Sequence, residues 1–181
     1  MTNQETTIEM LLKKINSLEE RVAAIESKGP KQKNGIATII NYHTPTINYL
    51  EWIKTLDPTQ ENMELIFSHG YIQGMSMMLC SLIEQSTDPP FILNRSKKNQ
   101  ILIYIDAKWS QMDNKQFETF IDIQQSKLLK IFKQWKLDNP KYLTDEYSEI
   151  LSKYHQNILG TKIPKITTIQ RIRNTVYNSL L

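Results

Sequence analysis

The stretch IEMLLKKINSLEERVAAI, residues 8–25, decides how the rest of this 181-residue chain is organised. Its apolar residues recur every seven positions, and a second apolar set follows three residues later, which is the a/d pattern of a coiled coil. The a positions are Ile8, Ile15 and Val22, and the d positions are Leu11, Leu18 and Ile25. β-Branched residues at a, with mostly leucine at d, favour a parallel dimer.

The charged residues beside this seam support the parallel arrangement. The g positions hold Lys14 and Arg21, and the following e positions hold Glu19 and Glu26. Each g residue would face an opposite charge across a parallel pair, and an antiparallel pair would lose that match. Met10 and Leu12 widen the apolar side, so a trimer, or a single amphipathic helix packed on its own domain, stays open as an alternative.

The chain is expected to divide into three parts. Residues 1–28 form the oligomerisation stem, and residues 29–35, which contain Gly-Pro and Asn-Gly turn signals, form a hinge. Residues 36–181 are long enough for one domain with a hydrophobic core of its own. We expect an α+β fold that is mostly helical, with a small β-hairpin or sheet packed on helices.

Composition favours a soluble intracellular protein. The single Cys80 excludes an internal disulfide, and it lies in an apolar run, where a buried inert thiol is expected. No run of 18 apolar residues is present, and the first residues do not resemble a signal peptide. We therefore expect no membrane association and a cytoplasmic location.

Charge is distributed unevenly along the chain. Residues 37–90 hold one lysine against six acids, whereas residues 91–181 hold fifteen basic residues against eight acids. A split of this kind is typical of polyanion binding, and it is equally expected if the two halves pack against each other.

Periodicity and capping signals place five helices and two strands in the domain. The helices are expected at about 47–56, 59–84, 113–137, 144–158 and 167–180. The strands are expected at 91–94 and 100–106, with residues 36–42 as the available third strand. The predicted caps are Asp57 with Pro58, Asp113 with Gln116, Thr144, and Gly160.

The second of these helices contains two glycines and a methionine run. Gly70 and Gly74 lie four residues apart, and each costs a helix about 1 kcal/mol relative to alanine, so they indicate a close contact or a kink. Four methionines share this helix, and their pattern indicates core packing rather than an adaptable binding groove. They are Met63, Met75, Met77 and Met78.

The run FILNRSKKNQILIYIDAKWSQMDN, residues 91–114, resembles a segment of uncharacterised proteins of the large nucleocytoplasmic DNA viruses. In those proteins a coiled coil precedes a small α+β domain. The matching residues are Asn94, Arg95, Tyr104, Trp109 and Asp113. Asn94 stands where the family pattern has aspartate, which is a departure. The resemblance implies a viral origin and no activity, because it brings no catalytic residues with it.

Patterns typical of catalysis or metal binding do not occur in the sequence. His43, His69 and His155 are scattered without a second ligand at helical spacing, and His69 is expected to be a core or boundary residue. The segment from Gly70 to Gly74 lacks the Lys-Ser/Thr of a phosphate-binding loop. We therefore expect no enzyme activity, no metal and no cofactor.

Nucleic-acid binding is the main alternative to protein binding. The basic hairpin loop and the C-terminal segment would contact phosphates, and two aromatic residues could stack on bases. The residues in question are Arg95, Lys97, Lys98, Tyr104, Trp109, Lys162, Lys165, Arg171 and Arg173. For Trp109, the role of a core anchor beneath the hairpin is expected to prevail over surface exposure. Basic residues are interspersed with acids, so the stem remains the stronger signal.

The sequence thus predicts a non-enzymatic, oligomeric scaffold or adaptor, plausible as a viral protein. It would bind itself as a parallel dimer or a trimer, and it would bind a protein partner through the tethered domain. Its location would be the host cytoplasm or the virion if it is viral.

Overall fold

The computed structural model describes Ile15, residues 43–95, Lys97, residues 99–160 and residues 164–181. The chain divides into two compact units, Met1–His43 and Thr44–Leu181, and nearly all of the described residues belong to the second unit. The predicted stem, the hinge and the candidate strand at 36–42 lie outside the described residues, apart from Ile15. Ile15 is helical, and the residue is half exposed in the single chain.

Two helices open the second unit. Helix α3 (Tyr49–Thr55) begins at Asn48, whose side chain accepts a hydrogen bond from the Glu51 amide. Helix α4 (Gln60–Glu84) begins at Thr59, which forms a capping box with Asn62. The predicted N-cap at Asp57 is therefore wrong, because the chain stays extended through Pro58 and the Thr59 hydroxyl takes that role.

Three short strands follow in an antiparallel sheet of order β1-β2-β3. Strands β1 (Phe91–Leu93) and β2 (Ile101–Ile105) form the predicted hairpin, with Phe91 opposite Ile103. The third strand among the described residues is β3 (Lys108–Gln111), which pairs with β2. The sequence pattern had not indicated it.

Helix α5 (Asn114–Asp138) matches its prediction closely. Asp113 accepts a hydrogen bond from the Gln116 amide, and the Gln116 side chain accepts one from the Asp113 amide, so the predicted capping box is confirmed. The side chain of Gln124 is fully buried on the inner face of α5, and its amide donates to the Ile53 carbonyl at 2.7 Å.

The C-terminal segments differ from prediction at their starts. Two 3-10 turns, η1 (Pro140–Leu143) and η2 (Asp145–Tyr147), precede helix α6 (Ser148–Leu159). The predicted cap at Thr144 is wrong, because its hydroxyl donates to the Lys141 carbonyl and closes η1. Gly160 ends α6 in the left-handed conformation, as predicted, and α7 (Lys165–Ser179) follows.

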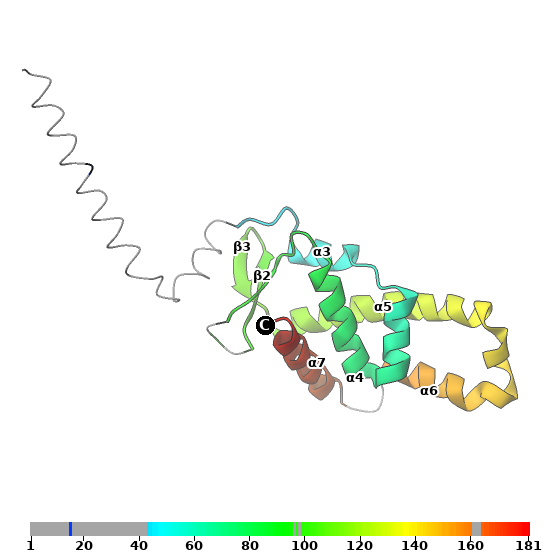
Figure 1. Cartoon of the computed structure of the whole chain (residues 1–181). Coiled ribbons are helices and arrows are strands. Elements are labelled where there is room, and N and C mark those ends of the chain that lie inside the picture. The colour runs from blue at the N-terminus through cyan, green and yellow to red at the C-terminus, as the bar shows by residue number, and fades with distance from the viewer. Residues whose placement is uncertain (1–14, 16–42, 96, 98, 161–163) are drawn as a thin grey trace, which may run out of the picture. The chain divides into compact units, whose positions relative to one another are not determined.

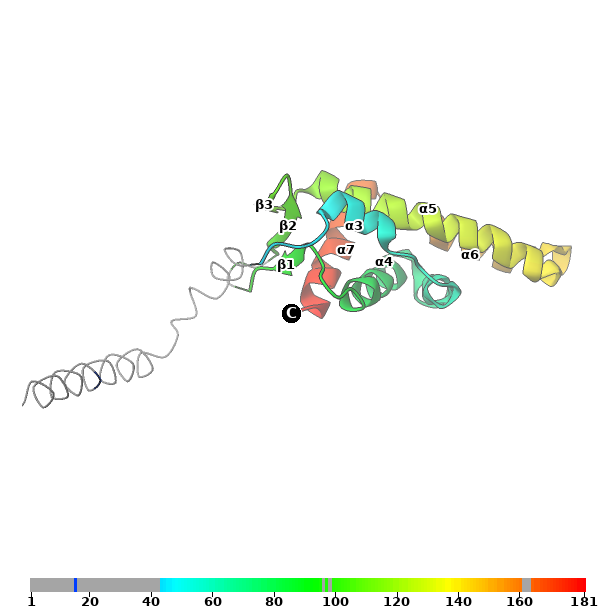
Figure 2. The same ribbon diagram turned by 90° about the horizontal axis from the view of Figure 1, so that it is seen from above.

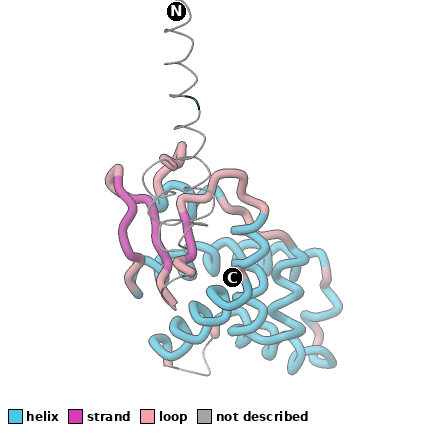
Figure 3. Tube along the Cα trace, turned by 60° about the vertical axis from the view of Figure 1, so that its left-hand side comes forward, coloured by secondary structure: helices cyan, strands magenta, loops and turns pink. Residues whose placement is uncertain are grey.

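These helices surround one continuous hydrophobic core. Helix α4 packs on α5, α6 and α7, and α5 and α6 run side by side and join through η1 and η2 (Figures 1 and 2). The sheet lies at one end of the helices (Figure 3). Met63, Met75 and Met78 are fully buried, which confirms the predicted core packing for these three methionines, whereas Met77 is partly exposed. Within the described ranges, no helix is long and apolar enough to span a membrane.

The turn between β2 and β3 makes a testable prediction. Asp106 and Ala107 have φ angles of 52° and 57°, the left-handed values that a two-residue hairpin turn requires. Alanine is strained in that conformation, and glycine is not. We expect Ala107→Gly to raise the free energy of unfolding by about 1 kcal/mol in denaturant titration.

A control of opposite sign is available in α5. Ser126 is exposed and helical, so Ser126→Gly should lower the free energy of unfolding by about 0.5–1 kcal/mol. A loss of stability in Ala107→Gly would mean that the left-handed turn does not form.

Candidate functional site

A sharp corner interrupts α4 at Gly70. Gly70 has φ of 75° and ψ of 174°, a conformation that is essentially restricted to glycine. The Asn157 side-chain amide on α6 donates toward the carbonyls of Ile66 and Phe67, at 3.5 and 3.4 Å. The sequence had predicted a kink or a contact at this glycine pair, and Gly70 provides the kink.

Gly74 provides the contact. A β-carbon at this position would lie 2.5 Å from the Ile66 α-carbon and 2.8 Å from the Leu65 carbonyl oxygen. The second half of α4 therefore crosses the backbone of the first half with no room for a side chain. One glycine turns the chain, and the other lets the two halves close on each other.

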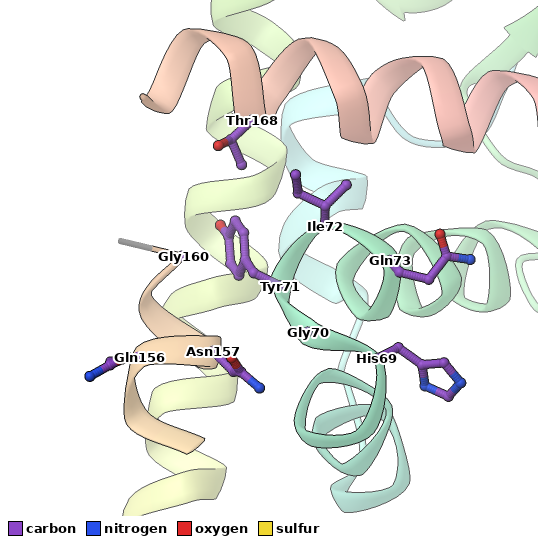
Figure 4. A pocket seen from close by; sticks show the side chains of 9 residues that line it. All are labelled: His69, Gly70, Tyr71, Ile72, Gln73, Gln156, Asn157, Gly160 and Thr168. Carbon is purple, nitrogen blue, oxygen red and sulfur yellow. The ribbon is translucent and has the colours of Figure 1, made fainter. Parts of the chain in front are cut away.

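A cavity of about 310 Å³ opens at this corner (Figure 4). Backbone and side chains from α4, α6 and α7 line it: His69, Gly70, Tyr71, Ile72, Gln73, Gln156, Asn157, Gly160 and Thr168. In Figure 4 the Tyr71 ring points toward Gly160 and α7, whereas His69 and Gln73 project away from that ring. His69 is exposed, with Nδ1 3.1 Å from the Leu65 carbonyl, so the prediction of a core or boundary position is wrong.

A second cavity, of about 400 Å³, shares Tyr71, Gly160 and Thr168 with the first. Its other walls come from α5, the end of α6 and the start of α7. Lys165 lies at this cavity and binds Glu118 at 2.6 Å and Asp122 at 3.2 Å. Burial raises the pKa of the Tyr71 hydroxyl, and the Asp122 carboxylate raises it further, so Tyr71 stays neutral.

The chemistry available in the two cavities is mainly that of binding. Volumes of this size suit small ligands or a partner's side chain. The polar lining of the first cavity consists mostly of amide and hydroxyl groups, which can hydrogen-bond to a neutral group. In the part of the chain that the structure describes, no cluster of three or more His, Cys, Asp or Glu side chains could hold a metal ion.

Cys80 does not belong to either cavity. Its side chain is buried, and desolvation raises the pKa of the thiol to about 11, with Glu84 adding to the shift. The prediction of a buried thiol is confirmed, and the raised pKa disfavours the reactive thiolate.

The predicted basic residues that the structure describes differ in their exposure. Arg95, Lys97 and Arg171 are exposed, and Lys98 lies outside the described residues. Arg173 is half-buried instead, and its guanidinium donates to the Met112 carbonyl and to Asn114 Oδ1, both at 2.8 Å. Arg173 thus ties α7 to the start of α5, and its role in ligand binding stays a prediction.

The predicted aromatic residues contact each other. Tyr104 and Trp109 are directly opposite on β2 and β3, and their rings meet edge to face at 5.6 Å. Trp109 is partly exposed and lies outside the buried core, so the expected role of a core anchor is wrong. The physical reason is that Trp109 pairs with Tyr104, which alternates with the core residue Ile103 and therefore lies on the other face of the sheet.

Tyr177, which the sequence did not indicate, holds the base of the basic loop between β1 and β2. The Tyr177 hydroxyl on α7 donates to the carbonyls of Asn94 and Lys97, at 2.8 and 3.2 Å. Only its place in a core-spaced helix could have suggested burial, and nothing local indicated its partners 80 residues earlier.

The acidic and basic halves of the chain meet mainly through apolar contacts and uncharged hydrogen bonds. Among the described residues, one ion pair joins them: Lys127 Nζ lies 2.7 Å from Asp57 Oδ1. The same ammonium donates to the carbonyls of Lys54 and Leu56 at the end of α3. Most of the opposite charges therefore stay on the surface.

The second unit is thus a mostly helical α+β domain with a small antiparallel sheet and a cavity at a broken helix. No protein-family model matches the chain, and no significant match was found to a curated protein or to a solved structure.

Proposed function

We propose that the chain is a non-enzymatic assembly protein, a scaffold or adaptor in which a coiled-coil stem gathers copies of the helical domain. The observation that carries this proposal is the joint match of a/d residues and e/g charges in residues 8–25. The continuous core of Thr44–Leu181 supports it, because such a unit can be carried as a folded module.

The mechanism of an assembly protein of this kind is avidity. Joining two or three domains through one stem makes the second binding event intramolecular, which raises apparent affinity for a repetitive protein partner by about 10²–10⁴. A location in the host cytoplasm or the virion, and the viral origin implied by residues 91–114, remain predictions.

The test is the mass of the full chain in solution by multi-angle light scattering. The unchanged chain should be a dimer or trimer, and Leu11→Asp/Leu18→Asp should be monomeric because charges would enter the seam. The matched control Asn16→Asp/Ser17→Asp makes the same change of charge at outward b and c positions and should leave the mass unchanged. A monomeric unchanged chain would contradict the proposal.

Nucleic-acid binding is the second candidate function. The exposure of Arg95, Lys97 and Arg171 favours it, and the use of Arg173 inside the domain weakens it. A gel-shift titration with duplex DNA and with RNA at several salt concentrations separates the two functions. Tight binding that falls steeply with salt and is lost in Arg95→Ala/Lys97→Ala/Lys98→Ala would establish the second one.

A further inference from the structure

The C-terminal half of α5 and the turn after it form a strongly basic surface. Between Asp122 and Asp138 the sequence contains four lysines and no acid. Three of these lysines, with one from η1, form what is here called the lysine ridge: Lys130, Lys133, Lys136 and Lys141. Lys130, Lys133 and Lys141 are exposed, and Lys136 is partly exposed.

None of the four ridge lysines forms an ion pair with an acid among the described residues. The ion pairs present there involve Lys127 and Lys165 instead. Lys136 and Lys141 lie over the rings of Phe132 and Tyr142, each at 5.1 Å, which holds two of the ammonium groups near the surface of the helix. Leu137 lies within the same stretch, and 64% of its surface is exposed.

The first turns of α4 carry the opposite charge. Glu61 and Glu64 are both exposed, and neither forms an ion pair with the described residues. Gln60 donates to Glu64 Oε1 at 2.9 Å, which restrains that carboxylate. The acidic residues of 37–90 and the basic residues of 91–181 thus form few ion pairs within one chain. Among the described residues, Lys127 with Asp57 is the single ion pair between these two halves.

We infer that the lysine ridge of one copy binds Glu61 and Glu64 of a second copy of this chain. The inference rests on the proposed function, because the stem would hold the two domains at high effective concentration. Exposed ion pairs contribute only about 0.2–1 kcal/mol each. They can hold two domains together only when a tether keeps those domains at a high effective concentration.

Two further considerations favour a second copy as the occupant. Both surfaces belong to the same domain, so a two-fold axis would form the contact twice, and a parallel dimeric stem has that symmetry. Leu137 within the ridge suits a protein surface, which can cover its apolar side chain, better than a phosphate backbone, which cannot.

The experiment measures the dissociation constant of the full-length oligomer by sedimentation equilibrium in one buffer of low ionic strength. Lys130→Glu/Lys133→Glu should weaken assembly about tenfold, since reversal replaces attraction by repulsion, and Glu61→Lys/Glu64→Lys should do the same. The chain that carries all four substitutions should recover the original dissociation constant. The matched control Lys115→Glu/Lys153→Glu makes the same change of charge at two exposed lysines outside the ridge and should have little effect.

Each contrary result has a distinct meaning. An oligomer whose dissociation constant is unmoved by either reversal overturns this inference and leaves the stem proposal intact. Weakening that the four-fold variant does not reverse shows that the two surfaces are not each other's partners. Binding of a 30-base-pair DNA duplex that is lost in Lys130→Glu/Lys133→Glu, without an effect on assembly, assigns the ridge to nucleic acid. A monomeric unchanged chain removes both the proposed function and this inference.

Discussion

Gly74→Ala is expected to lower the free energy of unfolding by about 3 kcal/mol or more. We expect a fraction of the purified variant to be unfolded for this reason. The added β-carbon would lie 2.5 Å from the Ile66 α-carbon and 2.8 Å from the Ile66 nitrogen. Both neighbours are backbone atoms, so no side chain can rotate away to relieve the overlap. The gain in helix propensity, about 1 kcal/mol, is too small to offset this cost.

Urea denaturation of purified variants provides the measurement, and two positions in the same helix provide controls. Gly70→Ala meets no atom within 4 Å, so it should cost only the strain of its backbone conformation, about 1–3 kcal/mol. Gln73→Ala changes an exposed residue and should stay within about 0.5 kcal/mol of the unchanged chain. A Gly74→Ala variant as stable as Gln73→Ala would show that the two halves of α4 do not cross as described.

Gly160→Ala is expected to lower the free energy of unfolding by about 2–4 kcal/mol, because two separate costs add. The residue has φ of 66°, which strains alanine. The β-carbon of the new alanine would also lie 2.6 Å from two ring carbons of Tyr71. Tyr71 lines both cavities.

A double-mutant cycle with Tyr71→Ala separates those causes. With the ring removed, only the backbone strain remains, and Gly160→Ala should cost about 1 kcal/mol. The same cost in both backgrounds would contradict the close approach of Tyr71 to Gly160. Tyr71→Phe keeps the ring and serves as the matched control, in which the full cost should persist.

Local signals in the sequence predicted much of the helical framework. The capping box at Asp113 and the left-handed end at Gly160 follow from side chains within a few residues, and both are confirmed. The glycine pair was predicted to mark a kink or a contact, and Gly70 and Gly74 supply one each.

Features that depend on distant residues or on unusual turns could not be predicted in this way. Strand β3 was missed because its turn is built from Asp106 and Ala107 rather than from asparagine and glycine. Arg173 looked like a phosphate ligand because a sequence does not reveal that carbonyl and amide oxygens some 60 residues away will take up its donors.

The candidate site illustrates the same limit. The cavity at the α4 corner joins Gly70, Asn157 and Thr168, which are far apart in the chain and come from three helices. The lysine ridge could have been found from sequence, since a lysine recurs every three residues from Lys127 to Lys136. Its lack of acidic partners among the described residues needed the structure.

The central claim is that the stem assembles in parallel, and a single cysteine in it provides the most direct measurement. Cys80 is buried with a raised pKa, so we expect it to oxidise much more slowly than a cysteine in the stem. Full-length Leu11→Cys is oxidised and run on a non-reducing gel, with Lys13→Cys as the outward-facing control. We predict a disulfide-linked dimer of Leu11→Cys and little linkage of Lys13→Cys, because identical d positions face each other in a parallel pair. Chains of Leu11→Cys that stay unlinked, or that link only to chains of Val22→Cys, would contradict the parallel stem.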